Sequence, residues 1–427
     1  MSSIVEEANF GRIRSFLWPI HRHEFRKFIP MVIMLFCVCF NYSVLRSLKD
    51  TLVITSSGAA VIPFIKVWAI LPCAVLMTLL FAKMSNIYSQ ERVFYVMVSS
   101  FLVAFALFAF VLHPFCEYLH PIGMVAPLEA MLPEGFKGLI AMCCYWTYTV
   151  FYVMCELWGS MVMSVLFWGF ANEITRIFEA RRFYSVFSIF SNIAAVTAGQ
   201  ASNFFSLGED YNPHLPFGSN AWEQTVDVIV LVVIASGVVM MLAFRWMNKN
   251  VLTDPAFDEL HKTKRALKAK KQKMSMKDSF NFLSNSKYLA CIAIIVVGYN
   301  LTMNLAEVVW KDQLRELYPS QHEFQTYLNN LTSATGLIST IVSLFMAWMI
   351  RRLGWTWTAS ITPFIMLFAC SGFFTFMIFK ETLSPAAIAL TGMTPLVIAV
   401  YFGAAQNCLS KAMKYSVFDS TKEMAFI

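Results

Sequence analysis

The chain has 427 residues, of which 58% are hydrophobic and only 14% are charged, and its net charge at pH 7 is +7. Soluble globular domains are roughly 45–50% apolar and about 25% charged. The composition therefore excludes a soluble enzyme, a disordered chain and a nucleic-acid-binding domain. Because each membrane span needs about 20 apolar residues, the sequence predicts an all-α polytopic membrane protein.

Ten apolar stretches follow a basic N-terminal segment, and each is predicted to be one span. No short hydrophobic region with a small-residue cleavage site precedes them, so no signal peptide is expected. The fourth stretch is too short for two spans and is predicted to be one extended or tilted helix. The stretches are 29–48, 61–82, 93–113, 138–170, 183–206, 225–245, 288–310, 325–350, 356–379 and 385–410.

The placement of Lys and Arg predicts the topology. The connections 114–136 and 207–224 contain neither residue, whereas the alternate connections and the N-terminal segment are basic. Since basic loops stay on the cytoplasmic side, the N-terminus is predicted to be cytoplasmic. The domains expected are a cytoplasmic segment 1–28, a six-helix bundle 29–245, a basic cytoplasmic linker 246–287 and a C-terminal bundle 288–427.

Short strings recur in the same order in the two halves of the chain. Residues 49–52 read KDTL and 311–314 read KDQL, while YSVF occurs at both 184–187 and 415–418. Parallel six-span repeats are the major-facilitator pattern. The repeat predicts a major-facilitator-like two-bundle carrier with about ten of twelve expected spans present, so that the last two helices would lie beyond the end of this chain.

Polar side chains recur at helical spacing on the first, fourth, seventh and tenth stretches, and this predicts a shared cavity. An ionisable group within a span costs about 2.5–3.5 kcal/mol on insertion scales and usually faces such a cavity. Cations would hold the phosphates of a polyanion, namely Arg46, Lys49, Lys311 and Lys411. Glu156 and Glu307 would bind substrate or couple its movement, and weaker candidates for a base or ribose are Tyr42, Tyr152, Asn300, Asn304 and Asn407.

Simpler explanations exist for each of these groups. Lys49, Lys311 and Lys411 lie near span ends, where a long side chain ordinarily extends to the membrane interface. Glu156 could form a structural ion pair with a neighbouring span, and Glu307 with Lys311 could be a plain i,i+4 pair within one helix.

Several functional classes lack their motifs. The sequence contains no GxxxxGK[ST], HExxH or GxSxG, and no pair of histidines within a span that could ligate haem. The ten cysteines lie mostly in apolar runs without CxxC spacing and are expected to be buried small side chains. We expect no metal, no cofactor, no nucleic-acid partner and no enzymatic activity.

The same residues carry a resemblance to a known family. The strings at 40–55, 62–72, 151–176, 304–314 and 404–427 resemble the ADP/ATP translocases of plastids and obligate intracellular bacteria, which are unrelated to the mitochondrial carrier. The resemblance implies a twelve-span carrier of the bacterial inner membrane that exchanges ATP for ADP. It also implies transport roles for Lys49, Glu156 and Glu307.

Two departures from the family pattern stand out. Many members have Glu where this chain has Ala60, and a further family lysine would lie past Ile427. The expected function is nucleotide transport, with ATP exchanged for ADP by alternating access in the lipid bilayer. The alternative is a proton-coupled importer of nucleoside triphosphates with broader base preference. A membrane enzyme or receptor using the same cavity is a third hypothesis, because fold does not fix function.

Overall fold

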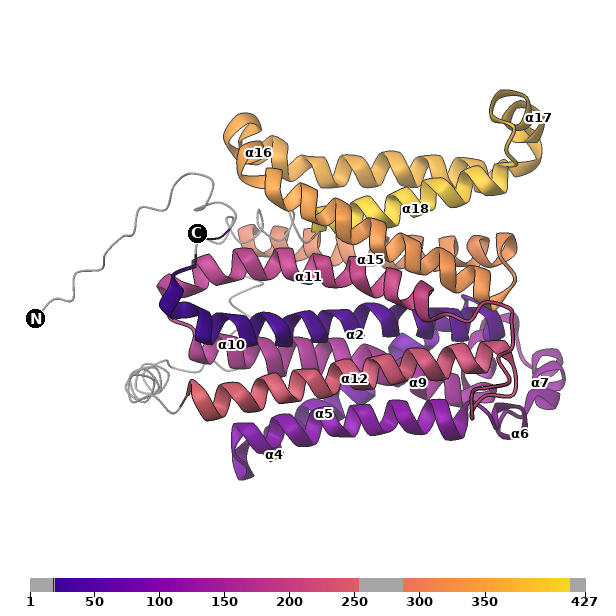
Figure 1. Cartoon of the computed structure of the whole chain (residues 1–427). Helices are drawn as coiled ribbons and strands as arrows, with labels where there is room; N and C mark the ends of the chain where they lie inside the picture. The colour runs from indigo at the N-terminus through magenta and orange to yellow at the C-terminus, as the bar shows by residue number, and fades with distance from the viewer. Residues whose placement is uncertain (1–17, 19, 253–286, 415–427) are drawn as a thin grey trace, which may run out of the picture.

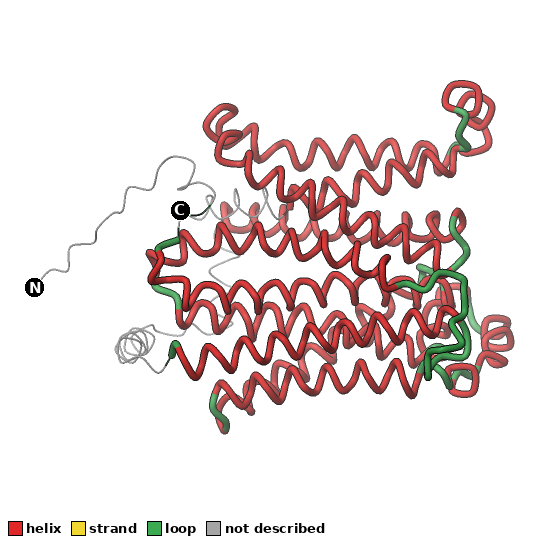
Figure 2. The backbone as a smooth tube through the Cα atoms, viewed as in Figure 1, coloured by secondary structure: helices red, strands yellow, loops and turns green. Residues whose placement is uncertain are grey.

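The structure is a computed structural model that describes residues 18, 20–252 and 287–414. The described residues form helices and no strand, as Figure 2 shows. This confirms the all-α class. Most of segment 1–28, most of linker 246–287 and the tail 415–427 lie outside the described residues, and so does the second copy of the YSVF string.

The N-terminal half is a bundle of long helices around α2, which spans Phe25–Ser57. The second long helix is continuous and consists of α3 (Val61–Phe64), the π-helix η2 (Ile65–Ile70) and α4 (Leu71–Ile87). The other long elements are α5 (Gln90–Leu107) with the π-helix η3 (Phe108–Leu112), α9 (Trp146–Leu157) with the π-helix η6 (Trp158–Phe167) and α10 (Trp168–Ile174), α11 (Ile177–Phe205) and α12 (Ala221–Asn250). Short helices at the chain's start and between η3 and α9 are η1 (Arg22–Glu24), α6 (Cys116–Leu119), η4 (Ile122–Met124), α7 (Val125–Met131), η5 (Glu134–Phe136) and α8 (Lys137–Cys144).

The described part of the C-terminal half, residues 287–414, contributes four helices, coloured orange to yellow in Figure 1. They are α15 (Lys287–Leu317), α16 (Gln321–Ile378), α17 (Lys380–Thr391) and α18 (Pro395–Met413). Helix α16 doubles back at Gly354, whose φ of +77° is a left-handed conformation that favours glycine. The break divides α16 into the two predicted stretches 325–350 and 356–379.

Two of the predicted spans are wrong in detail. The stretch 138–170 is not one helix, because α8 ends at Cys144 and a new helix begins at Trp146. The stretch 385–410 is bent by 83° between α17 and α18. Thr394 caps α18 by accepting from the backbone N–H of Val397, and Pro395 occupies its first turn, where the missing N–H is tolerated.

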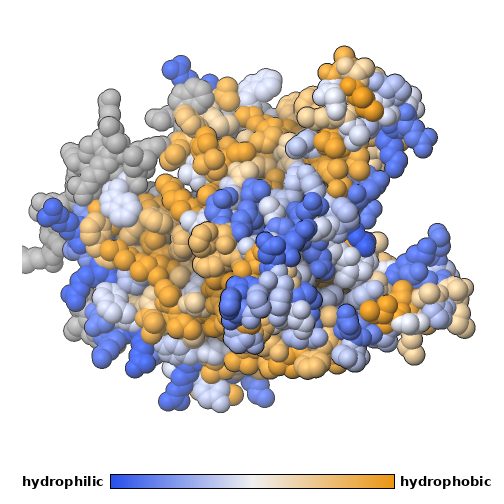
Figure 3. All heavy atoms as spheres, turned by 45° about the vertical axis from the view of Figure 1, so that its right-hand side comes forward, coloured by the Kyte–Doolittle hydropathy of each residue, from blue (hydrophilic) through white to orange (hydrophobic). Residues whose placement is uncertain are grey.

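The outside of the bundle is apolar, as expected for a protein in lipid. Six described helices are long and apolar enough to cross a membrane, or seven if the bent pair counts as one span, by length and composition. Helix α4 has no buried residue, and its large apolar side chains, such as Leu76 and Leu79, are exposed on the outside of the bundle. Figure 3 shows hydrophobic side chains along the flank and hydrophilic ones gathered at the loop end. A multi-pass membrane protein is therefore confirmed, while the number of ten spans stays a prediction.

The two halves meet where α11 crosses α16. A Cβ added at Gly199 would lie 2.2 Å from the carbonyl oxygen of Asn329, and one at Gly336 would lie 2.6 Å from that of Asn192. Both distances are too short for any side chain, so glycine lets the two backbones touch. Asn203 accepts a hydrogen bond from Asn329 beside this contact, at 2.9 Å. This close crossing brings α2 next to the C-terminal half.

Candidate functional site

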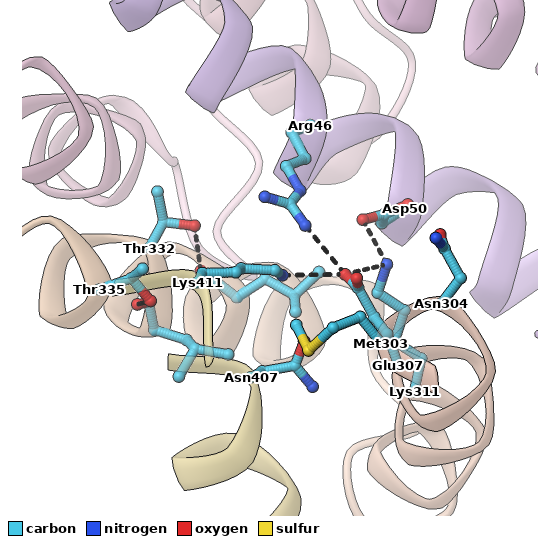
Figure 4. Close-up of polar contacts among 12 residues, drawn as sticks. Arg46, Asp50, Met303, Asn304, Glu307, Lys311, Thr332, Thr335, Asn407 and Lys411 are labelled. Carbon is cyan, nitrogen blue, oxygen red and sulfur yellow. Dashed lines mark hydrogen bonds and ion pairs between the residues drawn. The ribbon is translucent and has the colours of Figure 1, made fainter. Parts of the chain in front are cut away.

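Glu307 on α15 is the centre of a buried ion-pair network. Its Oε1 lies 3.0 Å from each of three cationic groups, the Nη2 of Arg46 on α2, the Nζ of Lys311 one turn along α15 and the Nζ of Lys411 on α18. Figure 4 shows these side chains converging from three helices. One carboxylate therefore joins the two halves of the chain.

Asp50 is a second acceptor in the same network. Its carboxylate accepts from the Nζ of Lys49 at 2.9 Å and from that of Lys311 at 2.8 Å. Lys49 also lies 3.0 Å from the Oε1 of Glu156, and its Nζ sits 3.6 Å from the centre of the Tyr152 ring. Both Lys49 and Asp50 are only 2% exposed. Sequence reasoning did not select Asp50 as a site residue, although the KDTL string contained it.

These groups line a polar cavity of about 180 Å³. Its walls carry six cations and three carboxylates, an excess of three positive charges. Lys66 on η2 is one of the cations that sequence reasoning left out. Its Nζ donates to Oδ1 of Asn304 on α15 at 2.5 Å, and no ion pair joins it to a carboxylate in the described part of the chain. A buried excess of positive charge is suited to a polyanionic ligand.

Helix irregularities and small residues shape this cavity. Lys66 lies on the π-helix η2, and the π-helix η6 starts two residues after Glu156. Such π-helical turns are frequent at functional sites. A Cβ at Gly159 would lie 2.7 Å from the Tyr42 ring, and one at Gly403 would lie 2.0 Å from Trp310. Glycine therefore lets an aromatic ring pack against the helix backbone beside the site.

A second, longer cavity of about 370 Å³ shares six residues with the polar cavity. The shared residues are Tyr42, Arg46, Asp50, Glu307, Lys311 and Lys411. From these groups the long cavity extends between α2, α10, α11 and α16. Its other end is lined by the aromatic rings of Trp168, Tyr184 and Phe187. The charged network therefore separates two differently lined spaces.

The structure brings ten of the eleven sequence-predicted site residues together around the polar cavity. The exception is Asn407, which is fully buried and lines neither cavity. Its Nδ2 donates to the carbonyl of Gly403 at 3.2 Å, and its Oδ1 has no hydrogen-bond partner among the described residues.

The simpler explanations hold only in part. Glu307 and Lys311 do form an i,i+4 pair, but Glu307 also contacts cations on two other helices. Glu156 is paired with Lys49 of another helix, yet its side chain is 29% exposed and lines the cavity. Among the described residues no group of three His, Cys, Asp or Glu side chains could hold a metal ion.

Comparison with known proteins identifies the family. The family model described as "TLC ATP/ADP transporter" matches residues 4–427. The chain belongs to the TLC ATP/ADP transporter family. This confirms the resemblance noted in the sequence, and the protein is a membrane transporter of nucleotides with ATP and ADP as substrates. The proton-coupled alternative is not favoured.

Curated relatives of this transporter are similar over nearly its whole length. It is 44% identical over 425 residues to ADP,ATP carrier protein 1 of Chlamydia pneumoniae, covering 99% of this chain and 82% of the relative. Identity is 38% over 431 residues to ADP,ATP carrier protein 1 of Rickettsia typhi, covering 100% and 84%. It is 38% over 405 residues to the chloroplastic ADP,ATP carrier protein 1 of Arabidopsis thaliana, covering 94% and 63%.

Two solved structures resemble this transporter at low sequence identity. One is the partially occluded inward-open xylose transporter XylE from E. coli, with a TM-score of 0.47 and 12% identity, covering 94% of this chain and 97% of that one. The other is a D-xylose-proton symporter, with a TM-score of 0.49 and 12% identity, covering 93% and 87%.

Proposed function

We propose that the transporter exchanges ATP for ADP by alternating access, and that Arg46, Lys49, Lys311 and Lys411 hold the phosphate chain. The excess of three positive charges in the polar cavity supports this proposal best. Phosphate oxygens accept charge-assisted hydrogen bonds from such side chains, and these are roughly twice as strong as neutral ones. Lys66 joins this set as a fifth phosphate ligand, because its Nζ contacts the amide oxygen of Asn304 and pairs with no carboxylate among the described residues.

The carboxylates compete with the substrate for the same cations. In the empty carrier Glu307 and Glu156 neutralise part of the positive charge, and a bound nucleotide replaces them at the lysines. Residues 29–245 and 288–427 act as the two bundles that rock around the site. A cavity without nucleotide keeps its excess charge and its interhelical ion pairs, so it changes sides slowly. This slow return of the empty carrier couples import of one nucleotide to export of another.

Substitution of the paired charges tests the proposal. Lys49→Gln and Glu156→Gln are each expected to abolish exchange of labelled external ATP for internal ADP in proteoliposomes. Lys380→Gln is the matched control, since that lysine is 53% exposed and lies outside both cavities. Wild-type exchange rates in both cavity variants, with correct insertion shown, would refute the mechanism.

The ribose is assigned to the junction of the two cavities, where Tyr42 lines both and offers its hydroxyl to a ribose hydroxyl. Tyr152, Asn300 and Asn304 line the polar cavity and offer hydroxyl and amide groups to the phosphate chain. Asn407 lines neither cavity, and its side chain donates to the Gly403 carbonyl of its own helix. Loss of the hydroxyl in Tyr42→Phe should weaken binding of ATP more than binding of its 2′,3′-dideoxy analogue. Equal weakening of the two ligands would contradict this assignment.

Exchange and proton coupling are separated by an uptake assay. Proteoliposomes without internal nucleotide are given labelled ATP with and without a pH gradient. Exchange predicts negligible net uptake in both conditions, whereas net uptake driven by the gradient would replace exchange by proton symport. The label recovered inside must still be ATP, because conversion to another compound would instead indicate an enzyme.

We also propose insertion in the bacterial inner membrane with the N-terminus in the cytoplasm. Basic residues gather in alternate connections, and the connection 207–224 has none. A membrane-impermeant thiol reagent applied to intact cells should label a cysteine placed at Asp210, between α11 and α12, but not one placed at Ser89, between α4 and α5. The reverse labelling pattern would invert the topology.

A further inference from the structure

We propose that the aromatic end of the long cavity receives the nucleobase of the transported nucleotide. This assignment rests on the proposed function, because it takes the phosphates to lie at the shared cations. The polar cavity has a volume of about 180 Å³, whereas ligand sites usually measure about 300–1,000 Å³. The long cavity, at about 370 Å³, is large enough for the remainder of a nucleotide.

The long cavity reaches from the charged network to the aromatic rings. Along α2 it is lined from Leu35 to Asp50, and at 1.5 Å per residue this span is about 22 Å. A nucleotide whose phosphates contact Arg46 can therefore place its base two or three helical turns away. The lining beyond the shared residues carries no charged side chain, which suits the uncharged part of a nucleotide and not its phosphates.

The rings at the far end are held in fixed positions. Trp168 packs edge-on against Tyr184, with ring centroids 5.1 Å apart and an interplanar angle of 85°. The hydroxyl of Tyr184 donates to Oδ1 of Asn172 at 2.5 Å, and its ring stacks on Phe187 at 5.8 Å. Trp168 and Tyr184 remain half-buried, so they keep surface for a ligand. Stacking on an aromatic side chain is worth about 1–3 kcal/mol per base and accepts every base.

One amide supplies a polar contact for the base. Asn192 of α11 lines the long cavity, and its side chain makes no hydrogen bond to another described residue. An amide offers both a donor and an acceptor, which match the paired donor and acceptor on the edge of a nucleobase. Ser188, one turn earlier, and the adjacent Ser191 also line the cavity. The cavity thus combines an apolar, aromatic body with a few polar groups, which is typical of small-molecule sites.

The test compares ATP with inorganic tripolyphosphate, which has the phosphate chain but no base. Dissociation constants are measured on the purified full-length carrier in detergent. In Trp168→Ala we expect ATP to bind roughly tenfold to a hundredfold more weakly, while tripolyphosphate binds as in the wild type. Trp168→Phe should recover most of the ATP affinity, because it keeps a ring.

Two controls keep failure of this inference distinct from failure of the proposed function. Trp246→Ala removes a tryptophan that is 44% exposed and lines neither cavity, and it should change neither constant. Lys49→Gln should weaken both ligands. Unchanged ATP binding in Trp168→Ala, or equal weakening of both ligands, would overturn the base site. Unchanged binding of both ligands in Lys49→Gln would instead overturn the phosphate site on which it rests.

Discussion

Replacement of Glu307 by glutamine tests whether a carboxylate and the substrate compete for the same cations. The substitution keeps the size of the side chain but removes its charge. Three cationic groups that now lie 3.0 Å from Oε1 would then share a neutral amide. Removal of one partner from a buried ion pair costs about 3–5 kcal/mol, because the other charge stays buried. The side chain of Glu307 is only 14% exposed, so this range applies.

The expected result is an empty carrier of lower stability that binds nucleotide more tightly. The apparent free energy of unfolding in detergent should fall by about 3–5 kcal/mol. ATP then brings back the missing negative charge without displacing a carboxylate. We expect its dissociation constant to fall about tenfold, which corresponds to about 1.4 kcal/mol. Exchange should nevertheless be lost, because the nucleotide no longer leaves readily.

Thermal unfolding with and without ATP, together with exchange in proteoliposomes, measures these effects. The matched control is Glu316→Gln, which lies nine residues further along α15 and is 51% exposed. It should leave stability, binding and exchange unchanged. ATP that binds Glu307→Gln as weakly as it binds Lys411→Gln would refute the reasoning, since Glu307 would then be part of the binding site and not a competitor.

Two further predictions concern residues outside the original candidate set. Asp50→Asn should destabilise the empty carrier by about 3–5 kcal/mol, because Lys49 and Lys311 lose a shared buried carboxylate. The Tm of the empty carrier should fall accordingly, and an unchanged Tm would contradict this prediction. Lys66→Gln should raise the KM for ATP about tenfold while leaving Tm within 2 °C, as expected for loss of one phosphate contact; an unchanged KM would remove Lys66 from the site.

The sequence predicted most of the charged site, because charge within apolar stretches is costly and helical spacing shows which groups share a face. It could not reveal Asp50 as an acceptor for both Lys49 and Lys311. Neighbouring residues on a helix do not face each other, and only the packing of α15 against α2 brings Lys311 to the Asp50 carboxylate. Lys66 could be interpreted from sequence as a lysine that extends to the membrane interface, because its partner Asn304 lies on a helix 238 residues away in sequence.

The fold was predictable to the level of its helices but not of their breaks. The bend between α17 and α18 did have a signal, because Gly392 with a φ of +71° ends one helix and Thr394 caps the next. The break at Tyr145 had none, since its neighbours are ordinary apolar residues within a long hydrophobic run. The long cavity was also beyond sequence reasoning, because its aromatic wall combines residues of α10 and α11 that no single periodicity connects.

The network gives a physical reason why exchange would be favoured over net transport. Two ion pairs, Arg46 to Glu307 and Lys311 to Asp50, join α2 to α15. If α2 and α15 separate when the carrier changes sides, these buried pairs must break, and charges left unpaired in the interior cost several kcal/mol. A nucleotide can compensate because its phosphates contact cations on both helices while the site reorganises. An empty carrier has no such anion, so its barrier to changing sides stays high. It therefore returns mainly after it has bound another nucleotide on the same side.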